Sequence, residues 1–263
     1  MSFQSLQYFS ETGDLQGVAD RLEEGEDPDE YDPEKGMVAL SLAAVNGHVE
    51  CVEALLEAAA DTTMPDKKLK QLPIHWALAA PKTDENPDPG PRALAILKLL
   101  LQKNNELLEE KDPDGCTPLM IAAKCGQTDA AILLRELGAE VNRKSKDGKT
   151  PLHYSCTNGH IAVTLALMAR GAYTHHTDND GDHPLTIASR NRHMDLALAM
   201  TQRGAFAPCK SIDKALGRTS RVIKDKSKRP KKTNAAPKSR SRSRKKRGKS
   251  AGSGSDTDGT SGA

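Results

Sequence analysis

Three of the eight histidines lie close together in the chain, at His175, His176 and His183, and imidazole is a common zinc ligand. A histidine pair that binds zinc is usually completed by cysteine or by a glutamate at helical ligand spacing. The sequence has no nearby cysteine and no glutamate at that spacing from His175 and His176. We therefore expect no bound metal and no cofactor.

A series of aspartates could offer a second kind of chemistry, general acid–base catalysis by paired carboxylates. The series consists of Asp112, Asp114, Asp147, Asp178 and Asp180. These residues recur at turn positions, where an aspartate side chain accepts hydrogen bonds from local backbone N–H groups. The sequence also contains no nucleophile elbow, phosphate-binding loop or dinucleotide fingerprint. We predict that the protein is not an enzyme and has no catalytic residues.

The turns belong to a unit that repeats every 33 residues, with its helix start at Thr117-Pro118, Thr150-Pro151 and His183-Pro184. Threonine favours the N-cap, and proline is tolerated at the first helical position because its missing N–H has no partner there. Asp-Gly pairs precede each start, at 114–115, 147–148 and 180–181, and suit a tight turn. Gly138, Gly171 and Gly204 then predict where the second helix of each unit ends.

The clearest copy, DGKTPLHYSCTNGHIAVTLALMARGA at 147–172, resembles the ankyrin repeat, a β-turn plus helix pair with a T-P-L-H-x-A signature. Five histidines fall in slots of that repeat: His48, His75, His153, His160 and His193. The resemblance implies an all-α fold, an ankyrin-repeat solenoid of helix-turn-helix repeats with β-turn fingers.

Weaker copies lie upstream, at 36–61 and from Gln71 onward. The second is 12 residues longer than the period, and the extra stretch is rich in proline, so we expect an inserted loop at 80–91 and its next helix from about Arg92. Residues 1–31 are predicted to form a degenerate capping repeat, since the end of a solenoid must show a polar face to water. Five repeats would then occupy residues 32–209.

Charge divides the chain into two regions. Residues 210–263 carry 18 Lys and Arg against 4 Asp and Glu, a net +14, whereas the whole chain carries +2, which leaves −12 for residues 1–209. The tail has no aromatic residue and too little apolar surface to offset the entropy of ordering. We predict one short helix at 210–223 and disorder at 224–263.

The sequence shows no basic-then-apolar leader and no apolar run of about 20 residues, so we expect a soluble intracellular protein with no membrane partner. The five cysteines are odd in number and form no C-x-x-C pair, which favours a reducing compartment.

In the ankyrin family, partner-facing positions lie around the turn and just before the Gly-His pair. The resemblance places them, together with Cys125, at Asp114, Lys124, Lys146, Asp147, Lys149, Tyr154, Thr157, Asn158, Asn179, Asp180, Asp182, Arg190 and Asn191. Two roles stay open for Trp76: it anchors a partner, or it packs under Pro81 and Pro87 to fasten the inserted loop. Tyr154 occupies the corresponding slot of its own repeat and leaves the same choice between partner contact and packing.

The tail contains two dense basic stretches, at 226–232 and 238–249, that resemble nuclear import signals and could also bind phosphate backbones. Their candidate residues are Lys228, Arg229, Lys231, Lys232, Arg240, Arg242, Arg244, Lys245, Lys246 and Arg247. Phosphates on Ser239, Ser241 and Ser243 would cancel much of the local charge.

The sequence thus favours a non-catalytic protein–protein interaction adaptor of the nucleus, shared with the cytoplasm. Its concave surface would hold a protein, and its tail would meet an import receptor and RNA or DNA. Two alternatives stay open: a nucleic-acid-binding protein acting chiefly through the tail, and a cytoplasmic protein that masks or inhibits a partner.

Overall fold

The computed structural model describes residues 5–80 and 89–205, which form α-helices, one 3₁₀-helix and connecting turns. In chain order the helices are α1 Leu6–Thr12, α2 Leu15–Glu23, α3 Ala39–Asn46, α4 Val49–Glu57, α5 Pro73–Ala79, α6 Gly90–Lys103, the 3₁₀-helix η1 Asn105–Glu109, α7 Pro118–Cys125, α8 Thr128–Glu136, α9 Pro151–Asn158, α10 Ile161–Ala169, α11 Pro184–Arg190 and α12 Met194–Gln202. The only β-structure in the described residues is an isolated bridge between Tyr31 and Val38.

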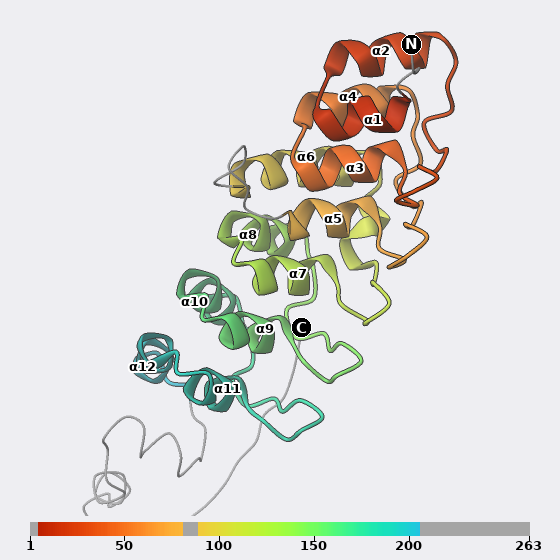
Figure 1. Cartoon of the computed structure of the whole chain (residues 1–263). Coiled ribbons are helices and arrows are strands. Elements are labelled where there is room, and N and C mark those ends of the chain that lie inside the picture. The colour runs from red at the N-terminus through yellow and green to blue at the C-terminus, as the bar shows by residue number, and fades with distance from the viewer. Residues whose placement is uncertain (1–4, 81–88, 206–263) are drawn as a thin grey trace, which may run out of the picture. The chain divides into compact units, whose positions relative to one another are not determined.

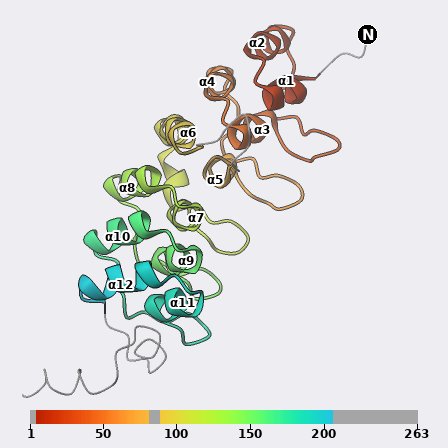
Figure 2. The ribbon, with the colours of Figure 1, turned by 60° about the vertical axis from the view of Figure 1, so that its left-hand side comes forward.

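The helices form two rows (Figures 1 and 2). The odd-numbered helices α1 to α11 pack side by side as an inner row, and the even-numbered helices α2 to α12 pack as an outer row. Each inner helix also packs on the outer helix that follows it, so the repeating unit is a helix pair. An all-α solenoid of helix pairs, as the sequence predicts, is therefore confirmed.

Inner helices begin where the Thr-Pro pattern predicts, with Pro118, Pro151 and Pro184 in the first turn. The capping chemistry differs from the expectation, because the Thr117 hydroxyl caps no backbone N–H and the Thr150 hydroxyl lies 2.8 Å from His153 Nδ1. Instead, His153 Nδ1 lies 3.1 Å from the Thr150 backbone nitrogen and accepts its hydrogen. His75 Nδ1 accepts from the backbone N–H of Leu72 in the same way, at 3.2 Å. The repeat histidine thus accepts a backbone hydrogen bond at the helix start, a role that the sequence assigned to threonine.

Five β-turn loops project from the inner row before α3, α5, α7, α9 and α11 (Figure 2). We call them fingers 1 to 5, at 32–37, 66–71, 112–116, 145–149 and 178–182. Each is closed by a backbone hydrogen bond between its first and last residues, for example Asp112 N to Cys116 O at 3.0 Å. The first aspartate of a finger caps the turn: Asp112 Oδ1 accepts from Asp114 N and Cys116 N, and Asp178 Oδ1 from Asp180 N and Asp182 N.

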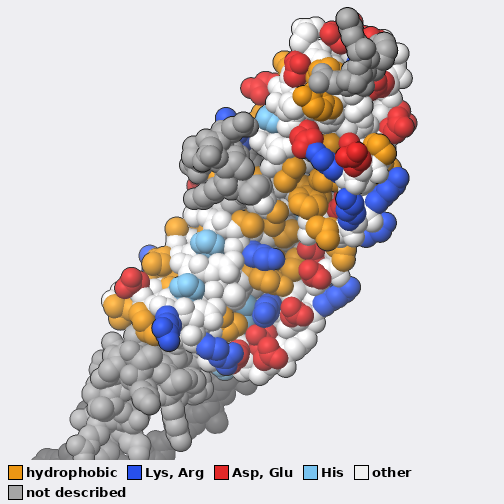
Figure 3. Space-filling model, in the orientation of Figure 1, with side chains coloured by type: hydrophobic (Ala, Val, Ile, Leu, Met, Phe, Trp, Pro, Cys, Tyr) orange, Lys and Arg blue, Asp and Glu red, His pale blue; other side chains and the backbone are white. Residues whose placement is uncertain are grey.

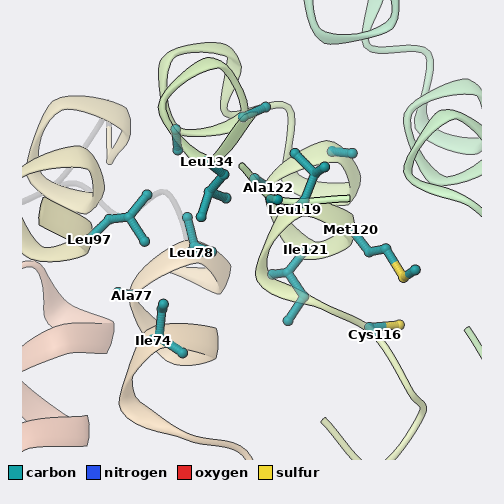
Figure 4. Packing of buried hydrophobic residues seen from close by; sticks show 14 of the residues in the cluster. Ile74, Ala77, Leu78, Leu97, Cys116, Leu119, Met120, Ile121, Ala122 and Leu134 are labelled. Carbon is teal, nitrogen blue, oxygen red and sulfur yellow. The ribbon is translucent and has the colours of Figure 1, made fainter. Parts of the chain in front are cut away.

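The core lies between the two rows. Leu119 and Leu152, the leucines of the Thr-Pro-Leu pattern, are fully buried. Figure 4 shows Leu97 and Leu134 of the outer helices pointing toward Leu78 of α5. Small residues such as Ala122 and Ala123 are also buried and let neighbouring inner helices approach closely.

The long second repeat departs from expectation in one place. Helix α6 begins at Gly90, two residues before the expected start at about Arg92, since Pro91 is tolerated in the first helical turn. The 3₁₀-helix η1 was not predicted. Residues 81–88 of the inserted loop lie outside the described residues, as do the expected helix at 210–223 and the tail at 224–263.

Candidate protein-binding face

The finger tips are joined to one another through the backbone. Lys146 N donates to Asp114 O at 3.0 Å, and Asn179 N donates to Asp147 O at 3.0 Å, so fingers 3, 4 and 5 form a continuous row. Lys67 N donates to Gly36 O at 2.8 Å and joins fingers 1 and 2. This ladder fixes the backbone and leaves the tip side chains facing outward.

The predicted partner-facing residues divide into two groups by what their side chains do. The first group points its charges to solvent: Asp114, Lys124, Lys146, Asp147 and Asp180 are exposed, as is Cys125, and Lys149 is half-buried. No part of the structure tests whether a partner binds them, so their role stays a prediction. Among the predicted residues, these side chains are the most available to a partner, because they point to solvent.

The second group is used within the solenoid. Asn158 Nδ2 donates to Lys124 O at 2.6 Å, Asn191 Nδ2 to Thr157 O at 2.9 Å and Asn179 Nδ2 to Lys146 O at 2.9 Å. Each bond reaches back to the preceding repeat. These three asparagines therefore have a structural task whether or not they also touch a partner.

Four further predicted residues bond locally. Thr157 Oγ1 donates to His153 O at 2.8 Å, and Arg190 Nη2 donates to Asp182 Oδ1 at 2.7 Å. Tyr154 Oη lies 3.1 Å from both Ser145 Oγ and Cys116 Sγ, which belong to fingers 4 and 3. These contacts establish that inner-helix side chains at the positions of Tyr154 and Arg190 point toward the fingers.

We call these positions the two finger-facing slots. The repeat register places Tyr8, Leu42, Trp76, Ile121, Tyr154 and Ile187 in the first slot, and Glu11, Val45, Ala79, Lys124, Thr157 and Arg190 in the second. The Trp76 side chain does point toward a finger, because its Nε1 donates to Asp66 Oδ2 of finger 2 at 3.2 Å. Its indole thus bonds to the finger of its own repeat, a partner that neither sequence interpretation named.

The half-buried Val45 and Ala79 in the slots of α3 and α5 were not predicted, because Val45 looks like an ordinary core residue in the sequence. Leu42, in the first slot of α3, is buried. The signal was present: counting back from Tyr154 by 33 residues reaches Ile121, and a further 45 reaches Trp76. Figure 3 shows hydrophobic side chains gathered over this part of the face. The apolar half of the face therefore lies amino-terminal to most of the predicted residues.

The histidines and cysteines of the described residues do not form a metal-binding or catalytic cluster. The Tyr173 ring lies 5.3 Å from the His175 ring, in a tilted contact, and 5.0 Å from the His176 ring, in an edge-to-face contact. His183 lies apart from them in the sequence, at the start of α11. Within the described ranges no three His, Cys, Asp or Glu side chains are grouped so that they could hold a metal. The four cysteines of those ranges are free, and burial raises the pKa of Cys51 to about 11 and that of Cys156 to about 12.

The remaining predicted residues fall in the basic tail, from Lys228 to Arg247, and lie outside the described residues together with Cys209. Of the helices described, none combines the length and the apolar character needed to cross a membrane.

Comparison with known families agrees with this geometry. The family model described as ankyrin repeats (3 copies) matches residues 92–145 and 137–211, and the single ankyrin-repeat model matches residues 35–67. The chain belongs to the ankyrin-repeat family. A comparison with curated proteins gave no match. The ankyrin repeats make this protein a protein–protein interaction module, so the face that carries the fingers is the first place to look for its partner.

Proposed function

We propose that this ankyrin-repeat protein is a non-catalytic adaptor that holds a protein partner against its fingers and inner helices. The row of finger tips is the observation that carries the proposal. Its backbone is fixed by bonds such as Lys146 N to Asp114 O, so the exposed tip side chains are presented without a large ordering cost. Stacked repeats extend such a row into a long surface.

The basic tail completes the proposal by directing the adaptor to the nucleus. Two stretches dense in lysine and arginine, at 226–232 and 238–249, suit the acidic grooves of an import receptor. The same charges would bind RNA or DNA by releasing counterions. Support comes from the division of charge between a body of −12 and a tail of +14.

The solenoid half is tested by affinity capture with the full chain and with a finger variant carrying Asp114→Ser, Lys146→Ser, Asp147→Ser and Asp180→Ser. All four side chains are exposed and none makes the inter-repeat asparagine bonds, so the fold should survive. A matched control changes the exposed Asp129 and Asp195 on the outer helices. We expect a protein partner that the finger variant loses and the control keeps. Equal capture by all three would place binding elsewhere.

The tail half is tested with the chain cut after Gly217. We expect the cut chain to keep its protein partner and to lose nuclear accumulation when imaged as a fluorescent fusion. Nuclear accumulation of the cut chain would contradict the tail's role. Recovery of only nucleic acid, dependent on the tail and stripped by salt, would favour the alternative of a nucleic-acid-binding protein.

A further inference from the structure

The finger-facing side of α3 and α5 differs chemically from the rest of the face. Its slots hold Val45, Trp76 and Ala79, all half-buried, and Leu69 at the tip of finger 2 is 56% exposed. We call these four residues the apolar patch. The corresponding second slots of α7, α9 and α11 hold Lys124, Thr157 and Arg190, so the patch ends at α7.

Trp76 is held in place before any partner arrives. Its Nε1 donates to Asp66 Oδ2, and Asp66, only 1% exposed, also accepts from the backbone N–H groups of Lys68, Leu69 and Gln71. The polar atom of the indole is thereby satisfied, and what the ring can still offer is apolar surface. A fixed tryptophan suits an interface anchor, because little side-chain freedom is lost on binding.

Finger 2 carries positive charge on both sides of Leu69, one of the four patch residues. Lys67, Lys68 and Lys70 are all exposed, with Lys67 Nζ 4.2 Å above the Tyr31 ring and Lys68 Nζ donating to Glu34 O at 2.8 Å. Lys70 adopts a left-handed φ of 55°, at the position that Gly36 holds in finger 1. Glycine would adopt that conformation with less strain. The finger therefore keeps a third cation where the backbone alone favours glycine.

We propose that the apolar patch and finger 2 bind a protein segment whose apolar side chains are flanked by aspartate or glutamate. This inference rests on the adaptor function and names the chemical class of its partner. The exposed acids on the neighbouring fingers, Glu34 and Asp114, are outnumbered by the three lysines, so an acidic segment is attracted. The chain's own tail is basic like finger 2, so its charge does not match that of the proposed segment.

A nucleic acid fits this surface less well. Single strands are held by several aromatic side chains on which successive bases stack, and the patch has one. The rest of the patch is aliphatic, which suits leucine, isoleucine or phenylalanine side chains.

The test is selection from a random displayed 12-residue peptide library on the full chain, followed by titration of the enriched peptides. Trp76 is the only tryptophan in the chain, so its emission reports contact at the patch directly. We expect enriched peptides to combine Leu, Ile or Phe with flanking Asp or Glu and to shift that emission. Binding should weaken as salt rises.

Variants separate the patch from general electrostatics. Lys67→Glu, Lys68→Glu and Lys70→Glu together should weaken binding at least about tenfold. The control of equal charge change, Arg92→Glu, Lys98→Glu and Arg203→Glu, alters exposed residues away from finger 2 and should not. Trp76→Ala, read by anisotropy of a labelled peptide, should also weaken binding, and thermal melts of each variant verify the fold.

Four results would overturn the inference: enrichment of no peptide, enriched peptides without acidic residues, affinity unchanged by the finger 2 reversal, or an oligonucleotide that displaces the peptide from Trp76. If peptides bind but depend on Asp114, Lys146, Asp147 and Asp180, the adaptor function stands and this inference alone fails.

Discussion

At the scale of single residues, His153 links two repeats. Its Nδ1 accepts from the Thr150 N–H, and its Nε2 lies 3.2 Å from Asp182 O in finger 5, so Nε2 is the nitrogen that carries the hydrogen and donates it. The side chain is fully buried, and burial lowers the pKa of His153 to about 4. A second proton on Nδ1 would face the Thr150 N–H. The neutral ring is therefore part of the fold.

This arrangement predicts a pH dependence of stability. The unfolded chain protonates His153 near the ordinary histidine pKa of 6.5, and the folded chain only near 4, so between those values the unfolded state binds more protons. The contribution of His153 to the free energy of unfolding should be complete above pH 7. It should fall as the pH drops from 6.5 toward 4, by up to about 3 kcal/mol. Denaturant titrations across this range measure it.

His153→Met is the matched control, because Met120 fills the same slot of the preceding repeat and is equally buried. The difference in unfolding free energy between wild type and this variant should shrink as the pH falls. If the two proteins lose stability in parallel, the histidine is not the group that titrates.

At the scale of elements, neighbouring helix pairs are joined where a glycine ends one inner helix and a histidine begins the next repeat's outer helix. A Cβ on Gly159 would lie 2.6 Å from His193 Nδ1, and one on Gly126 would lie 2.7 Å from His160 Nδ1. His193 Nε2 in turn lies 3.0 Å from Thr157 O, beside Gly159. Both the close approach of His193 to Gly159 and the hydrogen bond to Thr157 O require that Gly159 has no Cβ.

Gly159→Ala should therefore cost more stability than Gly171→Ala. Both glycines have left-handed φ angles, 76° and 89°, so both changes carry the backbone penalty of about 1–2 kcal/mol. A Cβ on Gly171 meets no atom within 4 Å, whereas one on Gly159 displaces His193 and its bond, adding about 0.5–1.5 kcal/mol. Thermal unfolding of the pair measures the difference. Equal losses would mean that the His193 contact contributes nothing to coupling.

Helices could be predicted from the sequence where a residue at the helix start, such as proline, and the repeat spacing define their first turn. Proline in the first turn and the 33-residue spacing predicted the starts of α7, α9 and α11 correctly. The start of α6 was predicted to within two residues, but the presence of η1 was not, because the insertion breaks the spacing there. The family resemblance identified the fingers, but not which finger residues are free.

The hydrogen bonds and the exposure of the residues on the candidate face could not be predicted from the sequence. Asn158 and Asn191 look like solvated polar residues in the sequence, and only the stacked repeats bring carbonyls of the preceding inner helix to their amides. Val45 looks like a core residue, yet the folded chain leaves it half-buried. Exposure and hydrogen bonding between repeats depend on packing, which no single repeat specifies.

At the scale of the whole solenoid, the buried residues form one continuous cluster, but the main helix contacts that build it run within a repeat and between neighbouring repeats. The tip-to-tip bonds join fingers 1 and 2 and fingers 3, 4 and 5. Among the described residues, no backbone bond joins finger 2 to finger 3. The repeats on either side are joined by the packing of α5 on α7 and of α6 on α8, and by side-chain bonds that include Gln127 Nε2 to Leu78 O at 2.8 Å. We expect this junction to be the boundary at which cooperativity weakens.

A pair of matched core variants tests this boundary. Leu152 and Leu40 occupy the same slot of different repeats and are both fully buried, so replacing either by alanine should cost about 2–5 kcal/mol. Hydrogen exchange of Leu152→Ala should show early opening of α9 to α12 with α1 to α4 still protected, and Leu40→Ala should show the reverse. Uniform loss of protection in either variant would contradict a solenoid coupled only between neighbours. Loss that stops between α6 and α7 would identify the junction of fingers 2 and 3 as the weakest, because the backbone ladder is interrupted there.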